Sequence, residues 1–156
     1  MTRWLDEDEQ RAWLRLAGVM LKLSPALDSQ LQRDSDLTHF DYLCLAMLSE
    51  AEGRRLRMSD LASRTNASLS RLSHVVSKLE RRGLVARCPS PESRRVTLVS
   101  LTDDGWERLV EAAPGHVETV RSLVFEGLPA ADVAALERIA GHIVEHVEAS
   151  RLRTVE

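Results

Sequence analysis

Apolar residues recur every three or four positions over most of the chain, which is the spacing of an amphipathic α-helix. The pattern predicts six helices, at residues 6–32, 38–51, 59–66, 68–82, 102–127 and 129–150. Proline removes a backbone donor and clashes with the preceding turn. We therefore expect Pro25 to kink the first helix or split it in two, and Pro114 to bend the fifth.

Capping residues mark several of these helix ends. Thr38 followed by Asp41 is the pattern of a capping box at the start of the second helix. Gly83 suits the left-handed residue that ends the fourth helix, and Thr102 suits the N-cap of the fifth. Pro129 suits the first turn of the last helix. Apolar residues in the first and last helices exceed what one small core needs, so both chain ends are expected to pack on a second copy.

Apolar and polar residues alternate after Gly83, which is the pattern of β-strands. "GLVARC" and "RRVTLVSL" both alternate, and "PSPES" separates them. The pattern predicts a two-stranded hairpin with a polar tip. Two short helices followed by such a hairpin are typical of a winged helix-turn-helix, with the hairpin as the wing. An ordinary helical hairpin followed by a hairpin with exposed arginines is the alternative interpretation.

Charge is distributed unevenly along the chain. Residues 54–95 hold eleven arginines and lysines against three carboxylates, a net charge of +8, so the rest of the chain carries −11 within the total of −3. This asymmetry favours a nucleic-acid-binding face on an acidic body, although a solvated basic surface would give the same count. Arg54, Arg55 and Arg57 either reach the DNA backbone or lie in a solvated loop.

Composition and motifs narrow the remaining classes. A chain of 156 residues with 44% hydrophobic and 29% charged residues predicts one soluble domain. No apolar run is long enough to cross a membrane and the N-terminus lacks a signal-peptide pattern, so we expect a cytoplasmic protein. We find no nucleophile elbow, phosphate-binding loop or zinc-protease motif. We therefore expect no enzyme activity, no cofactor and no bound metal.

Residues 54–105 resemble the MarR (multiple antibiotic resistance regulator) family of bacterial transcription factors. The resemblance rests on three motifs, L-E-x-x-G-L-V-x-R at 79–87, P-E-x-R-R at 91–95 and L-T-x-x-G at 101–105. "APGHVETVRSLVFEGL" is also similar to a group of actinobacterial members. The resemblance implies a mainly α fold with a small β-hairpin wing, a single domain over 1–156. Within it, a winged helix-turn-helix lobe would span 36–101, and 1–35 and 102–156 would form dimerisation helices.

The family resemblance also implies a function. Members are homodimers that bind pseudo-palindromic double-stranded DNA; most repress transcription, and many release DNA when a small, often phenolic, ligand binds between the dimer region and the lobe. Candidate DNA contacts are the exposed residues of the second helix of the motif and the wing, namely Ser68, Ser70, Arg71, Ser73, His74, Lys78, Arg94 and Arg95. Arg71 is suited to a bidentate hydrogen bond with guanine or to a phosphate contact. The resemblance aligns Arg95 with a minor-groove arginine.

The chain departs from the family pattern at three positions. Ser77 and Ser93 stand where many members have aspartate, and His74 stands where arginine is common. In relatives those carboxylates can pair with the wing arginine. We therefore hypothesise that the wing is more mobile here and becomes ordered on DNA.

Other interpretations stay open. Trp13, Met47 and Trp106 are candidates to line an organic-ligand cleft, although such residues are also ordinary core. His142 and His146, with His116, are candidates for zinc sensing, and Cys88 for thiol sensing, whereas Cys44 is expected to be an inert core residue. A winged-helix interaction module without specific DNA binding is a further alternative.

Overall fold

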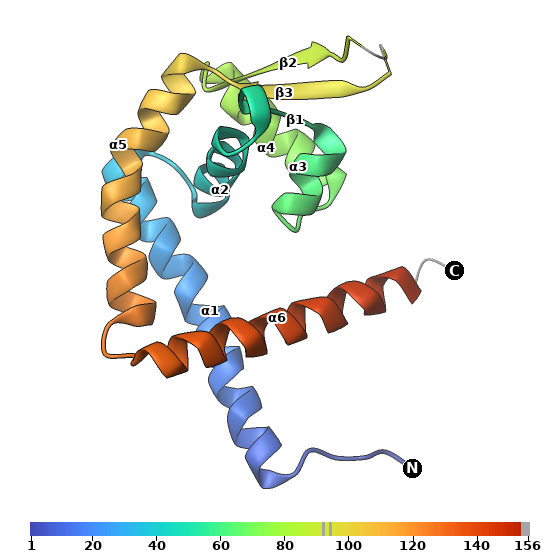
Figure 1. Ribbon diagram of the computed structural model, residues 1–156, viewed down its shortest axis with the longest axis vertical. Coiled ribbons are helices and arrows are strands. Elements are labelled where there is room, and N and C mark those ends of the chain that lie inside the picture. Colours follow the sequence, from blue (N-terminus) through green and yellow to red (C-terminus); the bar gives the residue numbers. More distant parts are fainter. Residues whose placement is uncertain (92, 94, 154–156) are drawn as a thin grey trace. The chain divides into compact units, whose positions relative to one another are not determined.

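The computed structural model describes residues 1–91, 93 and 95–153. It divides into two compact units, residues 1–119 and 120–156, and each is described by itself (Figure 1). The first unit is mainly helical with a small antiparallel sheet, which confirms the predicted fold class. Its elements are α1 (Glu7–Ser35), α2 (His39–Ser49), the 3₁₀ turn η1 (Glu52–Arg54), β1 (Arg55–Arg57), α3 (Met58–Arg64), α4 (Leu69–Arg81), β2 (Val85–Pro89), β3 (Thr97–Leu101) and α5 (Asp103–Val120).

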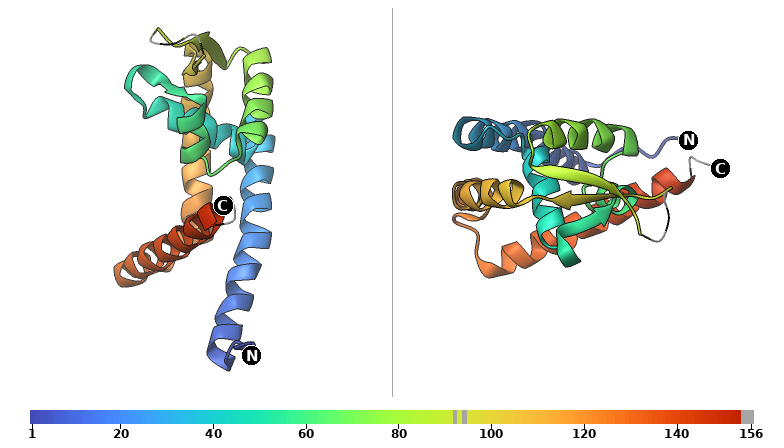
Figure 2. Two further views of the ribbon diagram at one scale, coloured as in Figure 1. Left: turned by 90° about the vertical axis from the view of Figure 1, so that its right-hand side faces the viewer. Right: turned by 90° about the horizontal axis from the view of Figure 1, so that it is seen from above.

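The sheet has three strands in the order β1-β3-β2, all antiparallel. It lies across one end of α2, α3 and α4 (Figures 1 and 2). The predicted two-stranded hairpin of β2 and β3 is confirmed, but the third strand of the sheet was not predicted. β1 adds a third strand, so Arg55 and Arg57 lie in a paired strand and not in a loop. Three residues are too few for an alternating pattern to be visible in the sequence.

Prolines do not interrupt the long helices. α1 runs from the Asp6–Glu9 capping box to Ser35 as one helix that includes Pro25, so the predicted split is wrong. Pro25 lacks the amide that would have bonded to the Leu21 carbonyl, and α1 continues as a helix across this missing bond. α5 likewise stays helical through Pro114 as far as Val120.

Leucine side chains dominate the core of the first unit. α2 contributes Cys44, Leu45 and Leu48, all fully buried, and so lies at the centre of the core. Burial raises the pKa of the Cys44 thiol to about 12, because the thiolate would be desolvated and close to Asp41. The thiol is therefore protonated and unreactive at neutral pH, as expected. The apolar stripe of α4, Leu72, Val76 and Leu79, packs into the same cluster.

The L-T-x-x-G motif has a steric explanation at the junction of α4, the wing and α5. Gly83 adopts a φ of 73° just after α4, as predicted. The Thr102 hydroxyl donates to the Gly83 carbonyl at 2.6 Å and accepts from the Gly105 amide at 3.0 Å. A Cβ atom on Gly105 would lie 2.0 Å from the Leu84 carbonyl oxygen. Only glycine lets the first turn of α5 lie this close to the backbone of Leu84, just after α4.

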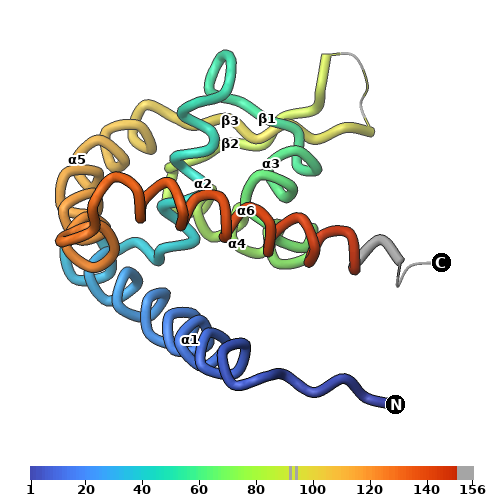
Figure 3. The backbone as a smooth tube through the Cα atoms, turned by 60° about the horizontal axis from the view of Figure 1, so that its bottom comes forward, coloured from blue at the N-terminus to red at the C-terminus, as the bar shows by residue number. Residues whose placement is uncertain are grey.

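The second unit contains a π-helical turn, η2 (Arg121–Phe125), and α6 (Ala130–Arg153), which Figure 3 traces as a single helix. Gly127 has a φ of 82° between them, and Pro129 immediately precedes α6. Large apolar side chains stay exposed along α6: Leu136, Ile139, Ile143, Val144 and Val147. None of the helices in the described ranges is both long and apolar enough to cross a membrane.

Replacing Gly105 with alanine is expected to destabilise the protein by roughly 2–4 kcal/mol, because the new methyl group overlaps the Leu84 carbonyl. Chemical denaturation would measure the loss. Gly18→Ala is the matched control, since nothing lies within 4 Å of its added Cβ in α1. The control should be neutral or stabilising. Equal effects of the two substitutions would contradict the steric explanation.

Candidate nucleic-acid interface

The exposed face of α4 collects most of the predicted DNA contacts. Ser68 is the N-cap, and its hydroxyl accepts from the Arg71 amide at 3.2 Å. One shallow groove on this face is lined by Ser70, Arg71, Ser73, His74, Val75 and Ser77. α4 follows α3 after a tight turn in which Asn66 has a φ of 52°. The structure thus brings four of the predicted residues (70, 71, 73 and 74) together at the start of the second helix.

Arg71 lies where two surfaces meet. Its guanidinium carbon is 4.3 Å from the ring centroid of Phe40, a cation–π contact with α2. Besides the α4 groove, Arg71 lines a cleft between α1, α2 and α4. That cleft is lined by Ser24, Asp28, Thr38, His39, Phe40, Leu43, Arg71, Val75 and Lys78. A molecule bound in the cleft would therefore contact a side chain that also borders the groove.

Lys78 forms an ion pair with Asp41, a partner that the sequence analysis did not predict. Its ammonium nitrogen lies 2.5 Å from Oδ2 of Asp41, which is fully buried. The same oxygen accepts from the Thr38 amide at 2.9 Å, which completes the predicted capping box. The Lys78 side chain is 36% exposed, so the ion pair lies at the edge of the core. Asp41 is an acid in the mostly apolar helix α2, and this feature of the sequence could have indicated that a cationic side chain pairs with it.

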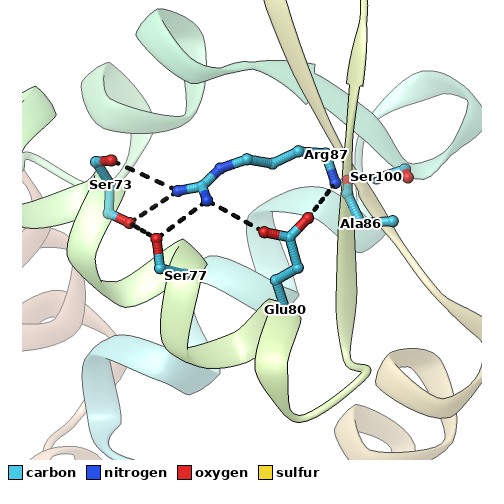
Figure 4. A network of polar contacts seen from close by, with 6 residues as sticks. All are labelled: Ser73, Ser77, Glu80, Ala86, Arg87 and Ser100. Carbon is cyan, nitrogen blue, oxygen red and sulfur yellow. Dashed lines mark hydrogen bonds and ion pairs between the residues drawn. The ribbon is translucent and has the colours of Figure 1, made fainter.

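Arg87 links the wing to α4 (Figure 4). Its guanidinium donates to Glu80 at 3.1 Å, to the Ser77 hydroxyl at 3.0 Å and to the Ser73 carbonyl at 2.8 Å. Its backbone amide donates to the other Glu80 oxygen at 3.0 Å. One side chain of β2 thus spans two turns of the helix. The Ser77 hydroxyl, at a position where the family often has aspartate, is one of its acceptors.

The wing tip is only partly described. Arg95 is exposed, and its amide donates to the Ser93 hydroxyl at 3.3 Å. The Ser90 amide donates to the Val96 carbonyl at 2.8 Å, which closes the loop. Arg94 lies outside the described residues. The hypothesis of a wing that becomes ordered on DNA stays a prediction.

The predicted ligand residues do not border the cleft beside α4. Trp13 is half exposed on α1, and Met47 packs against the core. Trp106 lies under the Arg54 guanidinium, whose carbon is 4.0 Å from the ring centroid. The cleft itself was not found from the sequence because its residues come from three separate helices, although Arg71 and Lys78 were candidates for DNA contacts.

The residues considered for zinc or thiol sensing belong to different units of the chain, with His116 and Cys88 in the first and His142 and His146 in the second. His142 and His146 lie on one face of α6 with ring centroids 4.2 Å apart, and Nδ1 of His146 contacts the His142 carbonyl. His116 is buried in the first unit, 4.3 Å from the Tyr42 ring, and burial lowers the pKa of its imidazole. Within the described ranges, no three His, Cys, Asp or Glu side chains could hold a metal ion together. Cys88 is an exposed free thiol.

Known proteins share both the sequence and the fold. The family model "MarR family" matches residues 37–97. The solved structure of Sco3205 from Streptomyces coelicolor, a MarR family regulator in complex with DNA, has 40% identity and a TM-score of 0.91, covering 94% of this chain and 91% of that one. The chain belongs to the MarR family. AbsC, a MarR family regulator from the same organism, has 40% identity and a TM-score of 0.90 over 95% of this chain and 99% of its own.

Curated relatives named as HTH-type regulators of transcription match over shorter ranges. The regulator YdcH of Bacillus subtilis is 33% identical over 51% of this chain and 55% of its own length, so the chain spans about half of that relative. The repressor YetL of B. subtilis is 27% identical over 77% of this chain and 71% of its own. The protein is therefore a winged-helix, DNA-binding regulator of transcription, and its MarR relatives are regulators and not enzymes.

Arg87→Ala is expected to destabilise this MarR protein by about 1–2 kcal/mol, because Glu80 loses its cation and the Ser73 carbonyl loses a donor. Ser77→Ala removes one acceptor and leaves Glu80 paired, so we expect a loss below about 0.5 kcal/mol. Urea denaturation of the two variants separates these effects. A larger loss for Ser77→Ala than for Arg87→Ala would show that the wing is held in another way.

Proposed function

We propose that the protein is a homodimeric transcriptional repressor that binds a pseudo-palindromic DNA site with α4 and the wing. The observation that carries this proposal is the groove that brings Ser70, Arg71, Ser73 and His74 together at the start of α4. Side chains near the N-terminus of such a helix read base edges in the major groove. The relatives YetL and IacR are named as repressors, which supports the direction of regulation.

Each candidate contact has a distinct role in this proposal. Arg71 leaves its contact with Phe40 and binds guanine or a phosphate, whereas serine hydroxyls add weaker contacts. Arg95 enters the narrow minor groove beside the wing, where negative potential is concentrated, and Arg94 holds a phosphate. Asp41 binds the ammonium group of Lys78, so only the exposed part of this side chain is left to contact the DNA backbone.

Dimerisation would cover the apolar side chains that a single chain leaves exposed. α1 exposes Leu14, Met20 and Leu21, α5 exposes Val110 and Val117, and α6 exposes the apolar residues given above. This much uncovered apolar surface favours association. We therefore assign residues 36–101 to the DNA-binding lobe and 1–35 and 102–156 to dimerisation. Two lobes related by a two-fold axis place their recognition helices about one DNA turn apart, roughly 34 Å, which requires an inverted repeat.

The cleft between α1, α2 and α4 is the proposed site for an organic effector. Arg71, Lys78 and His39 line it together with the rings and methyls of Phe40, Leu43 and Val75. This combination suits a small aromatic acid. Because Arg71 borders both the cleft and the groove, an acid that binds Arg71 would withdraw it from DNA. The protein acts in the cytoplasm in this proposal.

Fluorescence anisotropy with the DNA upstream of the protein's own gene would test the proposal. We expect sequence-dependent binding that weakens steeply with salt, because each phosphate contact releases counterions. Arg71→Ala should lower specific affinity by about 5- to 150-fold, corresponding to roughly 1–3 kcal/mol, and Arg95→Ala should also lower it. Arg81→Ala, at the far end of α4, is the control. The proposal would be contradicted if the protein bound the upstream DNA no more tightly than unrelated DNA, and if selection from random sequences also yielded no preferred site.

Ile139→Asp is expected to shift the protein from dimer to monomer, because it places a carboxylate in the apolar face of α6, where Ile139 is 49% exposed in the single chain. Sedimentation equilibrium would show at least a tenfold higher dissociation constant. Glu137→Gln, a neighbouring exposed position, should leave the dimer intact. An unchanged dimer in Ile139→Asp would place the interface elsewhere.

A further inference from the structure

A second arginine-lined surface lies beside the wing, in a cleft between η1, β1 and α3. It is lined by Ala51, Glu52, Gly53, Arg55, Leu56, Arg57, Asp60, Arg64 and Leu98. Arg55, Arg57 and Arg64 are all exposed. Neither the groove of α4 nor the cleft beside Arg71 includes these side chains.

The strand register sets where the arginines lie. Arg57 is opposite Leu98 and Arg55 is opposite Ser100, so Arg57 is nearer the wing-tip end of β3. Successive residues of a strand point to opposite faces. Arg55 and Arg57 are therefore on one exposed face of β1, whereas Leu56 between them packs against the core. The strand presents two guanidinium groups on the same side.

Packing places this cleft next to both proposed contact points with DNA, because β1 pairs with the wing strand β3 and α3 contacts α4. β1 pairs with wing strand β3, and α3 begins directly after β1 at Met58. α3 ends at Arg64, four residues before the N-cap Ser68 of α4. The segment from Arg55 to Arg64 thus contacts both the wing strand β3 and the recognition helix α4.

The geometry of the DNA duplex indicates what a basic surface next to both α4 and the wing would bind. A major groove and the minor groove next to it are separated by one sugar–phosphate backbone. A lobe that places α4 in the first groove and Arg95 in the second must face that backbone with the surface between them. Guanidinium groups are well suited to bind phosphates, because their planar donors match two phosphate oxygens at once.

We propose that Arg55, Arg57 and Arg64 bind the phosphates of the DNA strand that separates the major groove entered by α4 from the minor groove entered by the wing. This inference rests on the proposed function, since it requires that α4 and the wing engage neighbouring grooves. These contacts carry no base preference. They fix the register of the lobe on the duplex and add affinity for any sequence.

Two carboxylates in the same cleft oppose this binding. Glu52 and Asp60 line it with the three arginines, and Asp60 accepts a hydrogen bond from the Ser59 hydroxyl at 3.4 Å. Removing the Asp60 charge should therefore strengthen DNA binding. A gain in DNA affinity on removing the Asp60 charge is a useful test, because a misfolded variant does not gain affinity.

The experiment measures binding to a duplex of about 30 base pairs with unrelated sequence, over roughly 50–200 mM salt, where phosphate contacts dominate. Arg57→Ala and Arg64→Ala should each weaken binding about three- to tenfold at the lowest salt. Each should reduce the slope of log K against log salt by about 1. Asp60→Asn should strengthen binding about two- to fivefold. Circular dichroism would confirm that each variant is folded.

Two exposed positions provide charge-matched controls. Arg81→Ala removes a cation from the last turn of α4, about 18 Å along the helix from its start. Glu107→Gln removes an anion from α5, which runs along the other side of the lobe from α3 (Figures 1 and 2). Both should change affinity less than twofold.

The outcomes separate this inference from the proposed function. If wild type binds and Arg95→Ala weakens binding, but the α3 and β1 variants match their controls, the inference is overturned and the proposed function stands. If wild type shows no salt-dependent binding to any duplex, both are overturned. Losses for Arg57→Ala and Arg64→Ala with a gain for Asp60→Asn support the inference.

Discussion

The position of the recognition helix depends on one buried carboxylate. Asp41 caps the start of α2 through the Thr38 amide and binds the Lys78 ammonium group from α4. A buried charge is costly unless it is paired, so α2 and α4 stay stable only in the arrangement that keeps these partners in place. The leucines of the core supply the driving force for packing. Asp41 adds a directional requirement that apolar contacts do not have.

The wing is fixed to this frame from two sides. Arg87 holds β2 to the outer surface of α4, and the Thr102 hydroxyl joins the end of β3 to Gly83. Both contacts are made by residues of the sequence motifs, Arg87 within β2 and Thr102 just after β3. The tip of the wing lies beyond them, so the base of the hairpin is fixed independently of what the tip binds.

Helices and caps could be predicted from the sequence because their signals are local. The Thr38–Asp41 box, Gly83 and the stripe of α4 each lie within a few residues of what they determine. Pairs distant in sequence could not be predicted in this way. Lys78 and Asp41 are 37 positions apart, and β1 is visible only once β3 lies beside it. The groove on α4 was predictable from helix periodicity, whereas the clefts are lined by several elements and depend on packing.

The sheet also shows how a small β-structure avoids pairing with other chains. β1 is an edge strand of only three residues with an arginine at each end, and the opposite edge strand, β2, ends at Pro89. Short length, positive charge and proline all prevent a foreign strand from extending a sheet. The lobe therefore resists pairing between its sheet edges and the strands of another chain. The same arginines also keep this edge of the sheet charged and solvated.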